Sequence, residues 1–284
     1  MTSLIETCLK PLRVKSSPAL RKIFCRVCDL CAGSQAKIAT SIKSQNMILN
    51  ILWREIIWSQ VKRFSKEQIM TDVTIYGQQF SNFVRSVELA CLFTDVTYQI
   101  GHQHQGKDIE WKSEQHLAIH PFSRMPVLLQ GDFVLAESVA ICQYLALQDP
   151  QQRIIADDPQ QQAVQLQWAL LAAKEIDRGI IRRYLLELVM PTGENGKPDF
   201  ARMMRNKPDA LAVVAVVERQ LSKHKYIAGD SLSFADFILL PTLHYSLRLQ
   251  NDLSIVTPQS IIRDYVASAL TLPGVADILN YEGL

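Results

Sequence analysis

Glu137 and Ser138 stand where a helical pattern begins, and their side chains suit the two charges of an amino-acid head group. The amides and dipole at the start of the helix predicted over Val139–Leu147 favour an anionic group such as a peptide carboxylate. Glu137 supplies a negative charge for a ligand ammonium group. Ser138 has a second interpretation, in which its hydroxyl only caps the helix. The pair indicates a small zwitterionic ligand or, more simply, a capped helix.

A second segment with binding chemistry precedes this pair. Two apolar runs, Arg124–Leu129 and Phe133–Leu135, flank a three-residue polar turn, which is typical of a β-hairpin. Pro126 at the entry of the first strand removes one ladder donor, so that donor is unneeded or the Met125–Pro126 peptide is cis. A cis peptide would turn the Met125 backbone outward, where it could pair with a ligand backbone as a short added strand does.

Cysteines and histidines stand at spacings that can ligate a metal ion. Three cysteines follow the pattern C-x-x-C-x-x-C: Cys25, Cys28 and Cys31. Two histidine pairs have ligand spacing: His102 with His104, and His116 with His120. The cysteines lack a nearby fourth ligand, the first histidine pair lies in a polar loop, and Pro121 ends any helix carrying the second pair. We therefore expect histidines in solvated loops and no metal.

The elements that position these residues begin at a strand pattern, Val73–Tyr76, followed by a polar loop, a helical run from Asn82 to Phe93 and a second strand over Val96–Gln99. Parallel pairing of the two strands requires the helix between them as a crossover. An α/β unit is therefore predicted over residues 70–150.

Beyond a proline-containing linker, residues 157–284 show helical periodicity with no competing strand pattern. Met190–Pro198 is predicted to be a loop between helices. Ser233 and Asp236 are spaced as a capping box, which would start a buried helix. The second domain is therefore predicted to be all-helical.

Charge separates the first 69 residues from the rest of the 284-residue chain. Residues 1–69 hold 12 Lys and Arg against 4 Asp and Glu, whereas residues 70–284 hold 18 against 24. The first segment is interpreted as a basic extension, either an organelle presequence or sequence outside the core, and Ile48–Val61 has the periodicity of an amphipathic helix. No run approaches the roughly 20 apolar residues of a membrane span, and Cys91 and Cys142 stand alone in apolar segments. We expect a cytoplasmic protein, or a mitochondrial one if the extension is a presequence, without a nucleic-acid partner.

The run RMPVLLQGDFVLAESVAICQYLAL, residues 124–147, resembles the hairpin and ligand helix of cytosolic glutathione transferases. This resemblance implies that the backbone of Met125, before Pro126, pairs with the cysteinyl part of glutathione. It also implies that Glu137 and Ser138 hold the γ-glutamyl end, and that Arg124 meets the glycyl carboxylate.

The upstream run TIYGQQFSNFVRSVELACLF is similar to the first strand and helix of the serine-dependent classes, and the catalytic serine falls on Ser81. A thiol with a pKa near 8.5 is mostly protonated at neutral pH, and a hydroxyl donor at a helix N-terminus stabilises its thiolate. The alternatives are that Ser81 only caps the helix, or that Tyr76 is the donor. The loop lacks the family's usual proline. A serine instead of a cysteine at position 81 argues against the disulfide-exchanging branches.

The resemblance spans both domains, 215 of 284 residues. It implies a thioredoxin-like α/β domain, an all-α domain, a homodimer, and glutathione as co-substrate for attack on an electrophile or peroxide. Four residues are candidates for the second substrate's pocket: Trp168, Arg178, Arg182 and Tyr184. The alternatives are a non-catalytic binding or regulatory module, and a glutathione-dependent isomerase or dehalogenase.

Overall fold

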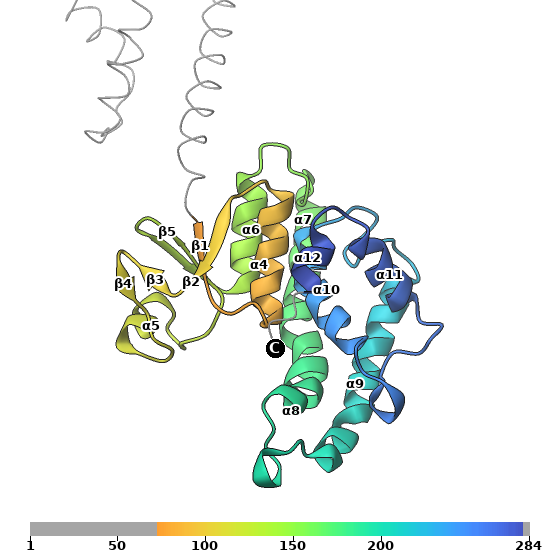
Figure 1. Cartoon of the computed structure of the whole chain (residues 1–284). Helices are drawn as coiled ribbons and strands as arrows, with labels where there is room; N and C mark the ends of the chain where they lie inside the picture. Colours follow the sequence, from red (N-terminus) through yellow and green to blue (C-terminus); the bar gives the residue numbers. More distant parts are fainter. Residues whose placement is uncertain (1–72, 281–284) are drawn as a thin grey trace, which may run out of the picture. The chain divides into compact units, whose positions relative to one another are not determined.

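A computed structural model describes residues 73–280. The predictions for residues 1–69, including the cysteine cluster and the amphipathic helix, lie outside the described residues. All described residues belong to one compact unit, Lys66–Leu284, in which a small sheet packs against a set of helices (Figure 1).

The sheet has four strands in the order β2-β1-β5-β6. Strand β1 (Val73–Tyr76) pairs in parallel with β2 (Tyr98–Gly101) across helix α4 (Asn82–Phe93), so the predicted first strand, helix and parallel crossover are confirmed. The second strand begins two residues later than predicted. Val96 donates its amide to the Cys91 carbonyl at 3.0 Å, which makes it part of the turn that closes α4.

The predicted hairpin is formed by β5 (Val127–Gln130) and β6 (Phe133–Ala136), and β5 lies antiparallel to β1. Because Gln130 pairs with Phe133, the turn is two residues long, one shorter than predicted. The predicted polar loop around His102 and His104 contains strand β3 (Gln103–His104), which forms a two-stranded ribbon with β4 (Lys107–Asp108). Helix α5 (Glu114–Ile119) follows this ribbon.

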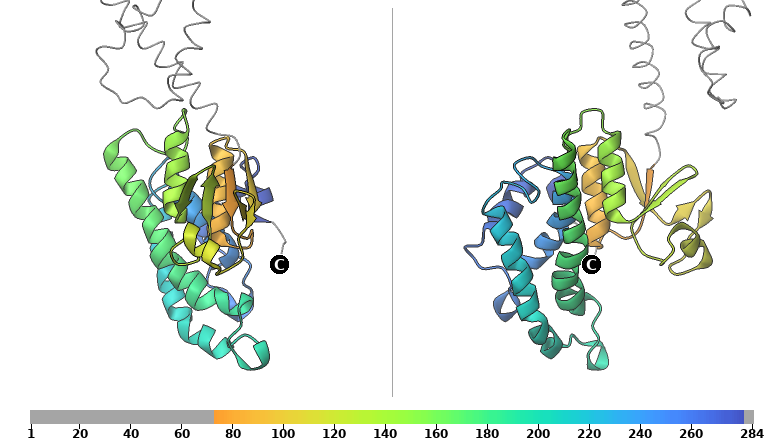
Figure 2. Two further views of the ribbon diagram at one scale, coloured as in Figure 1. Left: turned by 90° about the vertical axis from the view of Figure 1, so that its left-hand side faces the viewer. Right: turned by 180° about the vertical axis from the view of Figure 1, so that it is seen from behind.

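The two faces of the sheet have different cores. Helices α4 and α6 (Ser138–Gln148) lie side by side on one face, and Val73 and Ile75 join the main core there (Figures 1 and 2). A smaller cluster under α5 contains Tyr76, Ile119 and Val127. This alternation along β1 follows from the two-residue period of a strand.

The second half is helical as predicted. A continuous helical rod comprises α7 (Pro159–Leu171), the π-helical segment η1 (Ala172–Leu185) and α8 (Leu186–Val189), and α9 (Phe200–Leu221) packs beside it. The remaining elements are the buried α10 (Phe234–Ser246), α11 (Ile261–Leu270), α12 (Val275–Leu279) and the short turns η2 (Glu194–Gly196) and η3 (Asn251–Leu253). The predicted capping box of Ser233 and Asp236 opens α10.

Candidate active site

Ser81 is the residue immediately before helix α4, and its side chain makes no capping hydrogen bond. Its backbone amide donates to the Gln78 carbonyl at 2.9 Å, and its carbonyl accepts from the Arg85 amide at 3.1 Å. The interpretation of Ser81 as a side-chain cap is therefore wrong. Its half-buried hydroxyl lies at the positive end of a 12-residue helix, where it can donate to an anion.

Side chains on α4 and α10 hold the loop that leads to Ser81. The Arg85 Nε donates to the Gln79 carbonyl at 2.7 Å, and the Tyr245 hydroxyl donates to the Phe80 carbonyl at 2.7 Å. The Arg85 guanidinium also stacks over the Tyr245 ring, 4.9 Å from its centroid. These contacts hold the backbone of the loop at Gln79 and Phe80. The loop lacks the proline that is usual in the family that the sequence resembles.

The first turn of α4 is also tied to the helical half. Asn82 Nδ2 donates at 3.0 Å to both Asp177 Oδ1 and Thr242 Oγ1, and all three side chains are buried. The remaining Asp177 oxygen accepts from Arg182 Nε at 2.9 Å. The residue next to Ser81 is therefore fixed by η1 and α10.

The Met125–Pro126 peptide is cis, one of the two geometries that the sequence left open. Tyr76 pairs with Val127, so the residues before β5 lie beside those that follow β1. A Cβ placed on Gly77 would stand 3.4 Å from the Met125 Cβ, which shows how closely the two segments approach. The structure thus brings Met125 and the loop of Ser81 together.

Glu137 and Ser138 follow β6 directly. Glu137 is exposed, has a φ of 74° and holds the N-cap position of α6 without a side-chain cap, whereas Ser138 is the first helical residue and is buried. Ser138 as an N-cap is therefore wrong by one position. Because Ala136 pairs with Val127, both residues lie next to Pro126, as the binding prediction requires.

Arg124 has a different environment from its predicted partners. Its side chain is exposed and its guanidinium lies 5.7 Å from the centroid of the Phe122 ring. Its carbonyl lies 3.0 Å from His116 Nε2. The predicted contact of its side chain with a carboxylate stays a prediction.

The prediction that His116 and His120 are solvated loop residues is wrong. His116 is fully buried and His120 is 2% exposed. Both are covered because α5 lies over the second face of the sheet, where the His116 ring meets the rings of Tyr76 and Trp111 with centroids 4.7 and 4.9 Å apart. The available signal was their spacing of four residues, although α5 ends at Ile119 and His120 is its C-cap.

Tyr76, the second candidate for the hydroxyl donor, belongs to the cluster under α5. Its ring packs edge-on against His102 and tilted against His116, and burial raises the pKa of its hydroxyl. Its side chain therefore leaves the sheet on the face opposite α4, away from Ser81.

The four candidates for a second-substrate pocket have mostly structural contacts. Tyr184 is fully buried and its hydroxyl donates to the Leu253 carbonyl at 2.8 Å, and Trp168 packs against the main core. Arg178 pairs with Glu175, whereas Arg182 lies at the surface over the Phe83 ring. Arg182 neighbours the Ser81 helix through Phe83.

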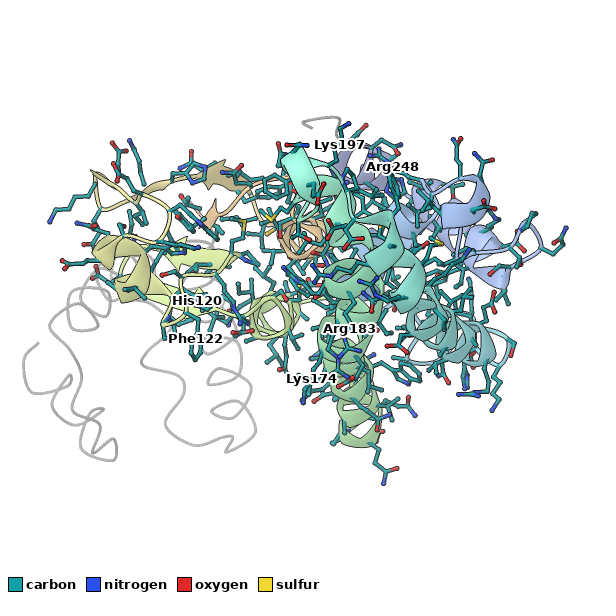
Figure 3. All side chains as sticks on the ribbon, turned by 90° about the horizontal axis from the view of Figure 1, so that it is seen from below. His120, Phe122, Lys174, Arg183, Lys197 and Arg248 are labelled. Atoms are coloured by element: carbon teal, nitrogen blue, oxygen red, sulfur yellow. The ribbon has the colours of Figure 1, made fainter. Side chains whose placement is uncertain are left out.

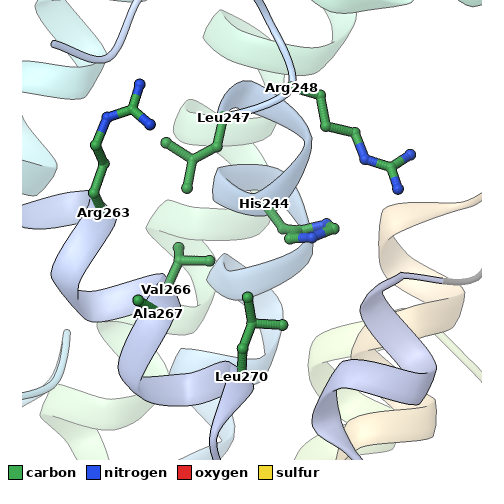
Figure 4. A pocket seen from close by; sticks show the side chains of 7 residues that line it. All are labelled: His244, Leu247, Arg248, Arg263, Val266, Ala267 and Leu270. Atoms are coloured by element: carbon green, nitrogen blue, oxygen red, sulfur yellow. The ribbon is translucent and has the colours of Figure 1, made fainter. Parts of the chain in front are cut away.

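A hollow of about 400 Å³ lies between α10 and α11 and includes none of the predicted site residues (Figure 4). Within residues 73–280, no group of three potential ligand side chains could hold a metal ion, and no helix is both long and apolar enough to cross a bilayer.

Two family models match the chain. The model described as "Glutathione S-transferase, N-terminal domain" matches residues 75–153, and "Glutathione S-transferase, C-terminal domain" matches residues 179–267. Glutathione S-transferase F10 of Arabidopsis thaliana is 30% identical over 61% of this chain and 80% of its own length. A glutathione S-transferase of Hyoscyamus muticus is 26% identical over 60% of this chain and 81% of its own length.

Solved structures show the same fold. A theta class glutathione S-transferase from Xanthomonas axonopodis pv. citri, solved with glutathione bound, superposes with a TM-score of 0.62 at 22% identity. The match covers 73% of this chain and 96% of that one. Poplar glutathione transferase F1 gives a TM-score of 0.63 at 22% identity, covering 74% and 97%.

Proposed function

Since the chain belongs to the glutathione S-transferase family, we propose that it is a glutathione transferase in which Ser81 activates the thiol of glutathione. The observation that carries this proposal is the Ser81 hydroxyl, which makes no capping bond at the positive end of α4 and follows a loop whose Gly77 approaches Met125. A hydroxyl donor at a helix N-terminus stabilises a thiolate more than a thiol.

The remaining site residues hold glutathione in this proposal. The Met125 backbone pairs with the cysteinyl part, Glu137 binds the γ-glutamyl ammonium group, and Ser138 with the first amides of α6 binds the γ-glutamyl carboxylate. Arg124, exposed beside them, meets the glycyl carboxylate. With glutathione in place, its thiol gives up a proton to solvent, and the thiolate then attacks an electrophilic carbon or a peroxide oxygen and displaces the leaving group.

The test uses the full chain. Glutathione binding is measured by calorimetry, and the pH titration of the bound thiol is followed by the ultraviolet absorbance of its thiolate. Ser81→Ala should raise the thiol pKa and lower kcat/KM by about 10- to 100-fold, the worth of one hydrogen bond to a charged group. Ser268→Ala, on an exposed part of α11, is the matched control.

An unchanged rate in Ser81→Ala would remove Ser81 from its role. Wild-type protein without saturable glutathione binding would instead favour a non-catalytic module on this fold. A panel of electrophiles, peroxides, and isomerase and dehalogenase substrates then separates the possible reactions.

We also propose a homodimer and a cytoplasmic location, with mitochondria as the alternative. Both follow from the family resemblance and from the composition of residues 1–69. Light scattering tests the first. Fractionation of cells that express the native chain, with mass spectrometry of its N-terminus, tests the second.

A further inference from the structure

His116 lies in the last turn of α5, and His120 is the residue that follows the helix, with an extended backbone and its amide bonded to the His116 carbonyl at 2.9 Å. Each uses its Nδ1 in the same way. The His116 Nδ1 accepts from the Lys112 amide at 3.1 Å, and the His120 Nδ1 accepts from the Phe122 amide at 3.1 Å. Figure 3 shows His120 next to Phe122.

These two bonds assign the protons. A backbone N–H can only donate, so each Nδ1 carries a lone pair and each neutral imidazole carries its proton on Nε2. The His116 Nε2–H donates to the Arg124 carbonyl at 3.0 Å. The His120 Nε2 stands 3.8 Å from Glu137 Oε1. One helix end thus directs two donors at the two segments that flank the glutathione site.

We propose that His116 and His120 are positioning residues of this site: His116 fixes the carbonyl that precedes Met125, and His120 orients the Glu137 carboxylate toward the ligand ammonium group. This inference rests on the proposed function. Neither imidazole touches glutathione in this arrangement. Both act through the residues that do. The two rings are held in place by burial, whereas the Glu137 carboxylate is 70% exposed and therefore open to a ligand.

The charge state of His120 fits this role. Burial lowers the pKa of His120, the neighbouring His116 and Arg124 lower it further, and Glu137 opposes them. His120 is therefore neutral near pH 7, and the full negative charge of Glu137 is left to the ligand. Protonation would break the bond from the Phe122 amide and place a competing cation beside Glu137.

Two amide substitutions separate the two ring nitrogens. His120→Asn keeps an acceptor close to Nδ1 for the Phe122 amide but does not reach Glu137, whereas His120→Gln reaches Glu137 with an N–H and loses the acceptor. If His120 orients Glu137, His120→Asn raises the KM for glutathione by at least about threefold with little change in kcat, and His120→Gln stays near wild type. The same pair at His116 tests the bond to Arg124.

The Glu137→Gln background is the control for this mechanism. There, His120→Asn should add no further increase in KM, because the carboxylate it would orient is gone. A purely structural His120 predicts the reverse pattern: a mild effect in His120→Asn, a severe one in His120→Gln, and losses of kcat and stability that persist with Glu137→Gln. That pattern would overturn the inference.

A readout that needs no glutathione separates this inference from the proposed function. In the free protein, nitrogen NMR should show His120 as the Nε2–H tautomer, and its titration midpoint should fall in Glu137→Gln because a neighbouring negative charge is lost. An unshifted midpoint with normal glutathione binding overturns the positioning role. A shifted midpoint in a protein that does not bind glutathione overturns the proposed function, and the positioning role with it.

Discussion

The replacement Asp236→Ala should destabilise the protein by about 3–5 kcal/mol. Asp236 is fully buried at the start of α10, and four donors converge on its carboxylate. Its Oδ1 accepts from the Tyr265 hydroxyl at 2.7 Å and the Ile227 amide at 2.9 Å, and its Oδ2 accepts from the amide and hydroxyl of Ser233 at 2.9 and 3.0 Å. Alanine leaves these donors buried without an acceptor.

Each unsatisfied buried donor costs about 1–3 kcal/mol, so the two amides and the Tyr265 hydroxyl set the scale of the loss. One effect works in the opposite direction. Burial raises the pKa of Asp236 despite these hydrogen bonds, so removing the carboxylate relieves part of its desolvation cost. The net loss is therefore smaller than the sum over donors.

The assay is urea unfolding followed by tryptophan fluorescence at neutral pH, with Asp264→Ala as the control. Asp264 is exposed in the first turn of α11, where its loss should cost less than about 1 kcal/mol. The expected loss for Asp236→Ala corresponds to a drop in Tm of about 6–20 °C for a domain of this size. If Asp236→Ala and Asp264→Ala unfold at the same urea concentration, the argument from buried donors is wrong.

Three further predictions concern the loop of Ser81 and the core behind it. Gly77→Ala would place a Cβ 2.5 Å from Val84 Cγ2 and should lower the free energy of unfolding by about 1–3 kcal/mol. Because the same loop leads to Ser81, transferase activity should also fall. Urea unfolding checks the first effect and initial rates check the second. Arg85→Met removes two hydrogen bonds of 2.7 Å to backbone carbonyls, one buried and one partly buried, and should cost about 3–5 kcal/mol by the same unfolding assay. Burial lowers the pKa of His244, so stability is retained above pH 6.5 and lost as pH falls below it, where the unfolded chain takes up a proton first. His244→Asn should lose less stability than wild type between about pH 6.5 and 5.

The sequence predicted those parts of the fold that depend on local patterns. The bounds of β1 and α4 were recovered because a β-branched run, a glycine and a long apolar period follow one another within residues 73–93. The hairpin was found because Pro126 and the polar turn bracket one apolar run. The Ser233–Asp236 capping box is likewise a contact between residues three apart.

Contacts between distant residues were not accessible in this way. The burial of His116 depends on β1, whose Tyr76 covers it from 40 positions upstream. The loop of Ser81 is held by Tyr245, and Arg85 reaches the carbonyl of Leu279, 194 residues away. The sequence around Tyr245 and Leu279 has no motif that would predict these long-range hydrogen bonds. The roles proposed for Ser81 and Glu137 therefore come from the family resemblance, while the residues that support them required the structure.

The hydrogen bonds that join the loop of Ser81 to the helical half also limit which halves of related proteins can be recombined into one chain. The Asn82 side chain and the Phe80 carbonyl have their partners on Asp177, Thr242 and Tyr245, which lie beyond the linker. Consider a chimera with its first half from this chain and its second half from a relative. It keeps these hydrogen bonds only if the relative has equivalent side chains at the positions of Asp177, Thr242 and Tyr245. Crossovers near residues 150–158 should therefore yield active chimeras from some pairs of parents and misplaced serines from others.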